Sequence, residues 1–444
     1  MPFFTELLGE KTILVAVVIF ALTYLCMMLF SKARAFIALG AAALFVLLGI
    51  MPVGQLAGAV NWNVILMIAG TMGTVALFIE SKMPAKMADW LIDKSANMKM
   101  AVIWLSIFSG VVSAFIDNVA TVLMIAPVAI NIAKKLKISP VPSIIAISIA
   151  SNLQGAATLV GDTTSILLGG AANMDFMDFF FFRPPGEALG VGLFWIVQAA
   201  FLAATGVLFV AFRKEKQPIH LEEKTQVKDY FPTALLLGTV LSLILVSFLP
   251  GEWFIVNGTV LPVNGIICVG IYLIGMLYYA INQHDGGILT RSLKEIDYFT
   301  LLLLAGLFVV IGGLEQVGVI AQIGQLFAKI SGNVFVIYTV IVWFSVLISA
   351  FVDNIPFVAT MLPVVTSLAP ILGVSPYVLY FGLLSGATLG GNLTPIGASA
   401  NIASIGILRK EGYHVKAGTF MKLSVPYTLT AVIAGYALVW LLWS

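Results

Sequence analysis

The chain has 444 residues, of which 60% are hydrophobic and only 10% are charged. This composition indicates an integral membrane protein and excludes a soluble domain with a single anchor. The net charge of +2 and the lack of a long basic run give no indication of nucleic acid binding. Cys26 and Cys268 both lie in apolar runs, which argues against a disulfide framework. We therefore expect a multi-pass protein, and we place it in the inner (plasma) membrane of a prokaryote.

Two copies of one motif organise the sequence. Residues 113–118 read Ser-Ala-Phe-Ile-Asp-Asn and residues 349–354 read Ser-Ala-Phe-Val-Asp-Asn, so the copies are related by a constant offset in numbering (353 − 117 = 236). A register kept without a gap over about a hundred residues indicates an internal duplication. The same offset relates Gly70 with Gly306, Pro127 with Pro363, Gly155 with Gly391, Thr158 with Thr394 and Gly161 with Gly397.

The hydrophobic runs, taken in chain order, divide the sequence into two halves joined by a charged linker. The first half is 1–212, the cytoplasmic linker is 213–231 and the second half is 232–444. The predicted full spans are 12–29, 35–51, 64–79, 190–212, 232–249, 264–281, 298–314 and 424–443. Together with one broken helix in each half, they make about ten transmembrane helices in an all-α fold.

Short apolar arms predict a re-entrant hairpin in each half, at 100–132 and at 334–369. The arms of the first hairpin have about 14–17 residues, whereas a full crossing needs about 20. The arms meet at Asp117-Asn118 in the first hairpin and at Asp353-Asn354 in the second. A carboxylate in hydrocarbon costs at least about 2.5–3.5 kcal/mol, so an acid at each tip needs a functional or structural reason.

A broken helix follows each hairpin, at 142–171 and at 376–407. In both, a polar stretch that contains glycine interrupts an apolar span. Unwound backbone at membrane depth is tolerated only where it lines a cavity or is buried in protein. The breaks therefore predict a polar site inside the membrane.

Lysine and arginine residues in short loops set the expected orientation, because such residues remain in the cytoplasm. They place the linker, the loop with Lys32 and Arg34, and the loop 291–297 on the cytoplasmic side, whereas the loop 54–63 has none. The N-terminus is then outside, the first hairpin opens to the cytoplasm and the second opens outward. Two copies of opposite topology form the inverted repeats that are typical of secondary transporters.

The motifs resemble those of the ion transporter superfamily. They comprise the two Asp-Asn tips, the stretch 151–162 (Ser-Asn-Leu-Gln-Gly-Ala-Ala-Thr-Leu-Val-Gly-Asp) and the stretch 390–401 (Gly-Gly-Asn-Leu-Thr-Pro-Ile-Gly-Ala-Ser-Ala-Asn). The sequence is most similar to the permease branch, with a citrate-transporter-like domain, that contains arsenite permeases, NhaD-type sodium/proton antiporters and P-protein-like members. The similarity covers about residues 60–180 and 297–425.

This resemblance implies a scaffold domain, a mobile transport domain that carries the hairpins and broken helices, and a homodimer. The divalent-anion/sodium symporters are more distant relatives, because their hairpin tips read Ser-Asn-Thr where both tips here read Asp-Asn. In arsenite permeases the Asn precedes the Asp, so the tips match P-protein-like members best. The motifs are specific for the superfamily and poorly specific for the substrate.

Polar residues at the tips and breaks form the candidate ion- and substrate-binding site. Half-helix N-termini suit an anion, whereas unwound carbonyls with Ser, Thr and Asn oxygens suit sodium. The alternative is that these side chains only satisfy backbone groups freed by the break. The candidate residues are Asp117, Asn118, Ser151, Asn152, Thr158, Asp162, Asp353, Asn354, Thr388, Asn392, Thr394, Ser399 and Asn401. The candidate sodium ligands among them are Asn118, Ser151, Asn152, Asn354, Thr388 and Asn392.

Three acids, Asp117, Asp353 and Asp162, are the candidate coupling groups. Burial raises the pKa of a carboxylate and a nearby cation lowers it, so each acid could exchange sodium for a proton. The alternative for the two tip acids is an N-cap of the returning helix. Asp162 has no counterpart, because Ala398 occupies the equivalent position. No Lys or Arg lies beside them in sequence, which argues against a highly charged anion as sole cargo, unless an arginine reaches in from elsewhere.

We expect an ion-coupled secondary transporter that works by alternating access. Sodium or protons are the expected coupling ions, no cofactor is expected, and the leading cargo is a small inorganic ion or a neutral oxyacid such as arsenous acid. The alternatives are a sodium-coupled carrier of carboxylates such as citrate and, from another class, an ion channel. An enzyme is not expected, because the sequence offers neither a nucleophile–base pair nor a metal cluster. No P-loop accompanies the chain, so ATP-driven transport would need a separate subunit.

Overall fold

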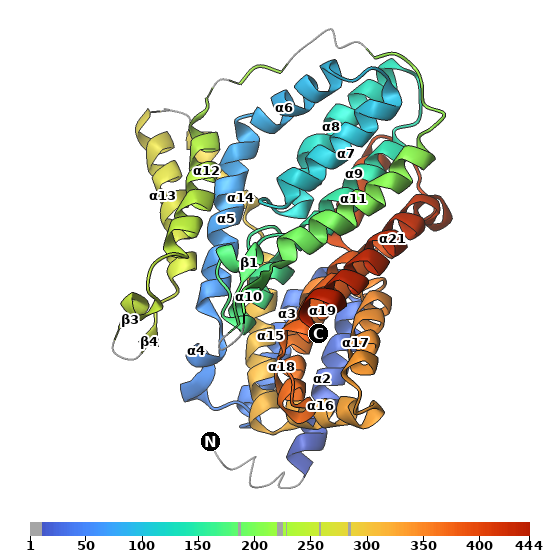
Figure 1. Cartoon of the computed structure of the whole chain (residues 1–444). Helices are drawn as coiled ribbons and strands as arrows, with labels where there is room; N and C mark the ends of the chain where they lie inside the picture. Colours follow the sequence, from blue (N-terminus) through green and yellow to red (C-terminus); the bar gives the residue numbers. More distant parts are fainter. Residues whose placement is uncertain (1–10, 185–187, 220–224, 228, 257–258, 283–285) are drawn as a thin grey trace.

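The computed structural model describes residues 11–184, 188–219, 225–227, 229–256, 259–282 and 286–444. These residues form an elongated bundle of helices (Figure 1). Part of the predicted linker, at 220–224 and 228, lies outside the described residues. The remainder of the linker is not helical, and α12 begins at its last predicted residue, Phe231.

The helices of the first half match its predicted elements. The α-helices are α2 (Thr12–Leu29), α3 (Arg34–Leu47), α4 (Leu56–Ala59), α5 (Trp62–Glu80), α6 (Met83–Asp93), α7 (Met98–Ser113), α8 (Asn118–Lys135), α9 (Val141–Gln154), α10 (Thr163–Ala172) and α11 (Leu193–Ala211). Short 3-10 helices are η2 (Ser31–Ala33), η3 (Val53–Gln55) and η4 (Met177–Phe179). The predicted hairpin corresponds to α7 and α8, and the predicted broken helix to α9 and α10.

The second half also has ten α-helices within the described residues. Its α-helices are α12 (Phe231–Val246), α13 (Val263–Asn282), α14 (Gly286–Glu295), α15 (Tyr298–Gln316), α16 (Val319–Ile330), α17 (Val334–Ser349), α18 (Asn354–Leu372), α19 (Tyr377–Gly390), α20 (Ser399–Lys410) and α21 (Ala417–Trp443). Its 3-10 helices are η5 (Gly251–Phe254) and η6 (Gly391–Leu393). The first residues of α15 to α20 follow those of α5 to α10 at the offset of the sequence repeat, as 298 − 62 = 236 shows for the first pair.

The two hairpins lie at opposite ends of the bundle. Figure 1 shows α7 and α8 in the upper part and α17 and α18 in the lower part. This arrangement agrees with copies of opposite topology, but the full inverted relation between the halves remains a prediction.

Two pairs of very short strands were absent from the prediction of an all-helical chain. β1 (Phe181–Phe182) pairs with β2 (Gly190–Val191), and β3 (Ile255–Val256) pairs with β4 (Thr259–Val260), both antiparallel. The first pair lies between α10 and α11, and the second lies between α12 and α13. Strands of two residues leave too little alternation for a sequence pattern to reveal.

Eight helices in the described ranges are long and apolar enough to cross a membrane, or nine if the bent pair α16–α17 is one span. The prediction was about ten. The counts differ because the second hairpin arms α8 and α18 are long enough to be included. In contrast, α3 and α12, with 14 and 16 residues, and the segments of the two broken helices are too short. The chain is a multi-pass integral membrane protein.

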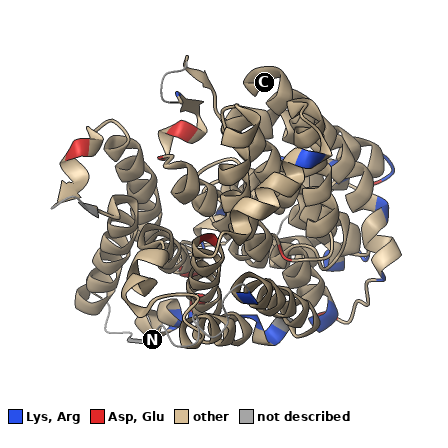
Figure 2. Ribbon diagram, turned by 90° about the horizontal axis from the view of Figure 1, so that it is seen from below, with Lys and Arg blue, Asp and Glu red and all other residues tan. Residues whose placement is uncertain are grey.

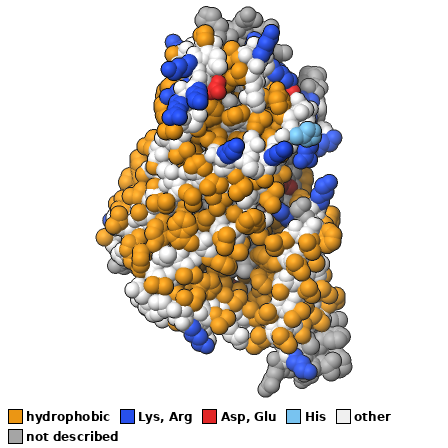
Figure 3. All heavy atoms as spheres, turned by 90° about the vertical axis from the view of Figure 1, so that its right-hand side faces the viewer, with side chains coloured by type: hydrophobic (Ala, Val, Ile, Leu, Met, Phe, Trp, Pro, Cys, Tyr) orange, Lys and Arg blue, Asp and Glu red, His pale blue; other side chains and the backbone are white. Residues whose placement is uncertain are grey.

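The surface fits this conclusion. In Figure 3, lysine and arginine side chains gather at one end of the molecule, and most of the remaining face is hydrophobic. Large apolar side chains such as Leu202, Leu273 and Leu347 are more than half exposed. A soluble monomer rarely exposes apolar patches this extensive, whereas a lipid-facing surface requires them.

Each half contributes a helix that packs on the other half. α13 packs along α5, and α3 packs along α15. Equivalent glycines permit both contacts: a Cβ at Gly306 would lie 2.7 Å from the carbonyl carbon of Ala38, and a Cβ at Gly70 would clash with the same atom of Cys268. Close backbone contact of this kind is how helices associate in a membrane.

Candidate functional site

The two hairpin tips have the same local structure. The Asp117 Oδ1 atom accepts hydrogen bonds from the backbone N–H groups of Val119 and Ala120, at 3.0 and 3.1 Å. The Asp353 Oδ1 atom accepts one from the Ile355 N–H group at 3.2 Å. Both acids are therefore N-caps, which is the structural alternative considered for them. One oxygen of each carboxylate, Oδ2, is not used by the cap.

A cavity of about 160 Å³ lies between the two tips. One wall is the apolar face of α5, and the other walls combine polar and apolar residues. The residues of the tips and of the second broken-helix segments that line it are Asp117, Asn118, Val119, Ala120, Leu123, Asp162, Thr163, Asn354, Ile355 and Ser399. The residues from outside the predicted site are Met72, Val75, Ala76, Ile79, Glu295, Asp297 and Thr300. The structure thus brings residues from both halves to one chamber.

Asp162 connects the halves at this cavity. Its Oδ1 atom accepts a hydrogen bond from the Thr163 N–H group at 2.8 Å, so it caps α10. Its Oδ2 atom accepts one from the Thr164 hydroxyl at 2.9 Å and one from the Asn354 amide at 3.3 Å. Asp162 is only 5% exposed. Asp162 accepts these hydrogen bonds from groups of both halves of the chain.

A chain of buried amides lies behind the cavity. The Asn118 amide nitrogen donates to Asn152 Oδ1 at 2.9 Å. The Asn152 amide nitrogen donates to the Thr388 carbonyl at 2.8 Å and to Asn392 Oδ1 at 3.1 Å. The Asn392 amide nitrogen donates to the Ile149 carbonyl at 2.9 Å. These bonds join the two breaks directly, so Asn152 and Asn392 link the halves as structural groups.

Other predicted residues join the same network. The Ser151 hydroxyl donates to the Asn118 carbonyl at 3.0 Å, and the Thr388 and Thr164 hydroxyls lie 3.2 Å apart. The Ser399 hydroxyl donates to Asp353 Oδ2 at 3.3 Å. Ser399 is the member of this group that lines the cavity.

Asn401 lies away from the cavity. Its amide nitrogen donates to the carbonyls of Gly391 and Thr394, both at 3.1 Å, and its Oδ1 atom accepts from the Ser148 hydroxyl at 2.8 Å. These bonds brace the unwound backbone of the second break. The structure therefore gives Asn401 the bracing geometry that was the structural alternative for this set.

Thr158 and Thr394 occupy equivalent places away from the cavity. The Thr158 hydroxyl donates to the Ala114 carbonyl, and the Thr394 hydroxyl donates to the Ala350 carbonyl. Both carbonyls lie where the first arm of a hairpin ends. Each threonine thus ties a broken helix to the hairpin of its own half.

We expect Thr158→Val and Thr394→Val each to lower the free energy of unfolding. Valine keeps the shape but leaves a buried carbonyl without its donor, which costs about 1–3 kcal/mol. Thermal unfolding of the purified protein in mild detergent measures the loss. Thr430→Val is the control, because the Thr430 hydroxyl donates to the Pro426 carbonyl of its own helix in an exposed hydrogen bond. A loss no larger than that of the control would show that these ties contribute little.

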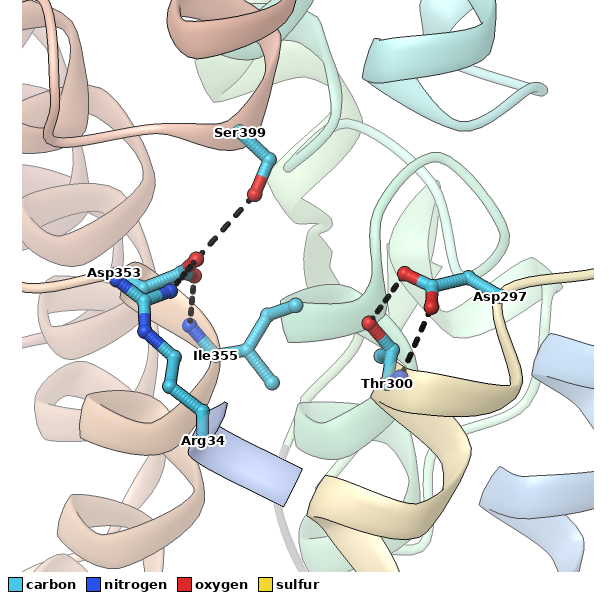
Figure 4. A network of polar contacts seen from close by, with 6 residues as sticks. All are labelled: Arg34, Asp297, Thr300, Asp353, Ile355 and Ser399. Carbon is cyan, nitrogen blue, oxygen red and sulfur yellow. Dashed lines mark hydrogen bonds and ion pairs between the residues drawn. The ribbon is translucent and has the colours of Figure 1, made fainter. Parts of the chain in front are cut away.

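Arg34 is an arginine that reaches the acids from elsewhere in the chain, the exception that the sequence left open. Arg34 Nη1 lies 2.8 Å from Asp353 Oδ2. Figure 4 shows the guanidinium on one side of Asp353 and Ser399 on the other. The side chains of Arg34 and Asp353 are 19% and 9% exposed. One of the three acids therefore has a fixed cation, supplied from α3.

Asp297 was also missed. It caps α15 by accepting hydrogen bonds from the Thr300 N–H group at 3.0 Å and the Thr300 hydroxyl at 2.6 Å (Figure 4). Its repeat equivalent, Asn61, caps α5 by accepting from the Val64 N–H group at 3.2 Å. A polar residue directly before each of two equivalent spans was the signal in the sequence that could have revealed it.

The cavity is electrostatically one-sided. Asp117, Asp162, Glu295 and Asp297 line it, and no lysine or arginine is among its lining residues. Figure 2 shows acidic positions inside the bundle as well as at its periphery. Clefts lined by one sign of charge concentrate ions of the opposite sign. Within the described ranges, no three His, Cys, Asp or Glu side chains are close enough to hold a metal ion, so a bound sodium would need amide, hydroxyl and carbonyl oxygens as well.

A bundle of membrane-crossing helices around a cavity lined by both halves is the arrangement expected of a membrane transporter. More specifically, the chain belongs to the citrate transporter family, whose sequence profile matches residues 18–384. This result confirms the resemblance to the ion transporter superfamily.

Relatives support the same class. The chain is 30% identical over 443 residues to an uncharacterized transporter of Mycobacterium tuberculosis, with 96% of this chain and 98% of the relative covered. It is 27% identical over 461 residues to the P protein of Homo sapiens, with 85% of this chain and 53% of that protein covered. The predicted likeness to P-protein-like members is therefore confirmed.

Solved structures share the fold. The Alcanivorax borkumensis YdaH transporter superimposes with a TM-score of 0.57 at 17% identity, covering 87% of this chain and 86% of that chain. MtrF of Neisseria gonorrhoeae, described as illuminating a class of antimetabolite efflux pumps, gives 0.50 at 19% identity, covering 88% and 81%. At these identities the similarity concerns the fold alone.

Proposed function

We propose that this protein is a secondary carrier that couples its cargo to sodium or protons at the acid-lined cavity. The observation that carries the proposal is the set of four acids around one chamber, two of which, Asp117 and Asp162, come from the tip and the break of the first half. Asp162 is buried and Asp117 is half-buried, and an unpaired carboxylate inside the membrane is costly unless a cation or a proton occupies it. Alternating access would expose the same groups to each side in turn.

The proposed exchange uses the oxygens that the local structure leaves available. Asp117 caps α8 with Oδ1, which leaves Oδ2 for a proton or a sodium ion. Asn118 and Asn354 donate their amide hydrogens elsewhere, and their side-chain oxygens accept no hydrogen bond from the residues that the structure describes. These oxygens, with the carboxylate of Asp162, are the sodium ligands that we favour. Protonation of either acid would then compete with sodium binding.

The leading cargo is a small inorganic ion or a neutral oxyacid, since a cavity lined by acids repels a free polyanion. A carboxylate such as citrate, accompanied by cations, is the second candidate. Two observations favour it. The family model is described as a citrate transporter, and Arg34 places one guanidinium beside a hairpin tip. A guanidinium is the side chain that best recognises a carboxylate.

The test is sodium-driven proton movement in liposomes that contain the purified protein and a pH dye. We expect exchange in the wild type and its loss in Asp117→Asn, because asparagine can keep the N-cap but cannot hold the proton. Exchange should also weaken as the pH falls, since protons then compete with sodium. A folded wild type without any exchange would reject the antiport form of the proposal, and uptake of arsenite and citrate would then be measured.

Asp297→Asn should weaken sodium binding without unfolding the protein. Asn61 already caps the equivalent helix, so the fold should tolerate the change. Loss of one exposed charge near a cation is worth about 1 kcal/mol, or about a fivefold higher sodium concentration for half-maximal exchange. Exchange rates across a sodium titration measure the shift, and thermal unfolding checks the fold. An unchanged sodium concentration for half-maximal exchange would show that Asp297 does not contribute to cation binding.

A further inference from the structure

Three cavities follow one another along α5. A pocket of about 1020 Å³, which we call the large pocket, borders residues 57–63 and Leu66 together with Gly169, Gly170 and the loop after α10. A void of about 20 Å³ borders Ile68, Thr71, Met72 and Val75. The central cavity borders the next turns, from Met72 to Ile79. The small void and the central cavity share Met72, Val75, Asp117, Asp162 and Thr163. The seam between α5 and α10 therefore lies between the large pocket and the site.

The seam is closed at Gly170. A Cβ at this position would lie 2.8 Å from the Asn61 amide nitrogen and 2.8 Å from Val64 Cγ2. Helix α10 thus packs directly on the first turn of α5, between the large pocket and the small void. A larger side chain at this position would force the side chains of Asn61 and Val64 to move, because a real Cβ essentially never lies so close to other atoms.

The equivalent seam of the second half is open. Gly406 is the repeat equivalent of Gly170 (406 − 170 = 236), and a Cβ there would meet nothing within 4 Å. Asp297 and Thr300, the equivalents of Asn61 and Val64, line the central cavity instead of packing on α20. Asp297 and Glu295 are exposed, so the cavity communicates with that side of the protein. The two halves therefore have equivalent residues at this point, but the contact is closed at Gly170 and open at Gly406.

We propose that the two seams are the alternating gates of the cavity, with Gly170 closing one on Asn61 and Val64, and Gly406 closing the other on Asp297 and Thr300. This inference rests on the proposed carrier function, because a fixed pore would not need two exclusive closures. The structure is then the state open toward Glu295, on the side that the lysines and arginines assign to the cytoplasm. In the opposite state α20 packs on α15, and the large pocket joins the central cavity along α5.

The gates explain why both positions are glycine. Gly170 has a steric reason in this state, whereas Gly406 has none, since its surroundings are open. In the proposed opposite state, Gly406 would be the residue that must be small, because α20 would then pack on α15. A bulky side chain at either position should therefore shift the population of states without blocking the site itself.

Cysteine cross-linking tests the gates. The variants V64C/G170C and T300C/G406C are prepared on a background in which Cys26 and Cys268 are replaced, and oxidised in liposomes. We expect V64C/G170C to cross-link rapidly and T300C/G406C to cross-link more slowly, as the opposite state is visited. Adding Gly170→Leu to the second pair should raise its rate at least severalfold, and adding Gly406→Leu should raise the rate of the first pair. Gly206→Leu is the matched control, since a Cβ there also meets nothing within 4 Å.

The outcomes separate this inference from the proposed coupling. A T300C/G406C pair that never cross-links, while V64C/G170C does, would overturn the alternating seams, and so would bulky substitutions that leave both rates unchanged. Cross-linking needs neither sodium nor a proton gradient. If both pairs respond as expected while the wild type shows no sodium–proton exchange, the gates are supported and the coupling proposal fails.

Discussion

Asp162→Asn is expected to abolish coupled exchange while the protein remains folded. Asparagine has the same shape, and its carbonyl oxygen can replace Oδ1 as the cap of α10. Its amide nitrogen then takes the place of Oδ2 and can donate to the Thr164 hydroxyl. It cannot carry the charge that a cation needs or take up the proton that replaces it. If that charge contributes about 2.7 kcal/mol to cation binding, its loss lowers the exchange rate at limiting sodium about 100-fold.

Asp162 lies between the two halves of the chain. It belongs to the first break, but it accepts a hydrogen bond from Asn354 at the second hairpin tip. An ion bound there would contact groups from both repeats, so its binding and release would change the contacts of both. The equivalent residue, Ala398, provides no such group. One acid without a partner in the repeat makes the site chemically asymmetric.

The measurement is the liposome exchange assay, with thermal unfolding as the check on folding. Glu252→Gln is the control, because Glu252 is an exposed acid of η5 and does not line the cavity. We expect the control to exchange as the wild type does. An Asp162→Asn variant that exchanges at the wild-type rate would remove Asp162 from the coupling mechanism.

The tips and breaks could be predicted because they conflict with their surroundings. Asp117 and Asp353 stand in apolar sequence, and the duplication makes each support the other. The constant offset between the two copies also predicted the order of the helices from α5 to α20. These features are local or periodic, and a single sequence is sufficient to show them.

Partners across the fold could not be predicted. Arg34 and Asp353 are separated by 319 residues, and a positive residue between two spans is most simply interpreted as a loop charge. Nor does composition reveal which polar atoms are already bonded. Thr158, Thr394 and Asn401 have the residue types of ion ligands, but their hydrogen bonds brace the backbone. Asn118 and Asn354 have the same chemistry and face the cavity.

Arg34→Gln is expected to destabilise the protein, and Asp353→Asn should restore much of the loss. Removing one partner of a buried ion pair leaves an uncompensated charge, which costs about 3–5 kcal/mol for a fully buried pair. Arg34 is partly exposed, so we expect the lower end of that range or less. The double variant has no unpaired charge. Its loss of unfolding free energy should therefore be smaller than the sum of the two single losses by at least about 1 kcal/mol.

The same variants distinguish two roles for the arginine. The two equivalent glycine contacts pair Ala38 of α3 with Cys268 of α13, an offset of 230 (268 − 38 = 230). At this offset Asn264 of α13 corresponds to Arg34 of α3 (264 − 34 = 230), so α13 offers no equivalent guanidinium to the first tip. If Arg34 only neutralises Asp353, the double variant should transport as the wild type does. If Arg34 also binds the cargo, the double variant should have a raised KM for a carboxylate such as citrate and an unchanged KM for a neutral oxyacid. The double-variant cycle in thermal unfolding, combined with uptake of both solutes, measures each effect separately. Additive losses of stability would show that the ion pair contributes nothing as a pair.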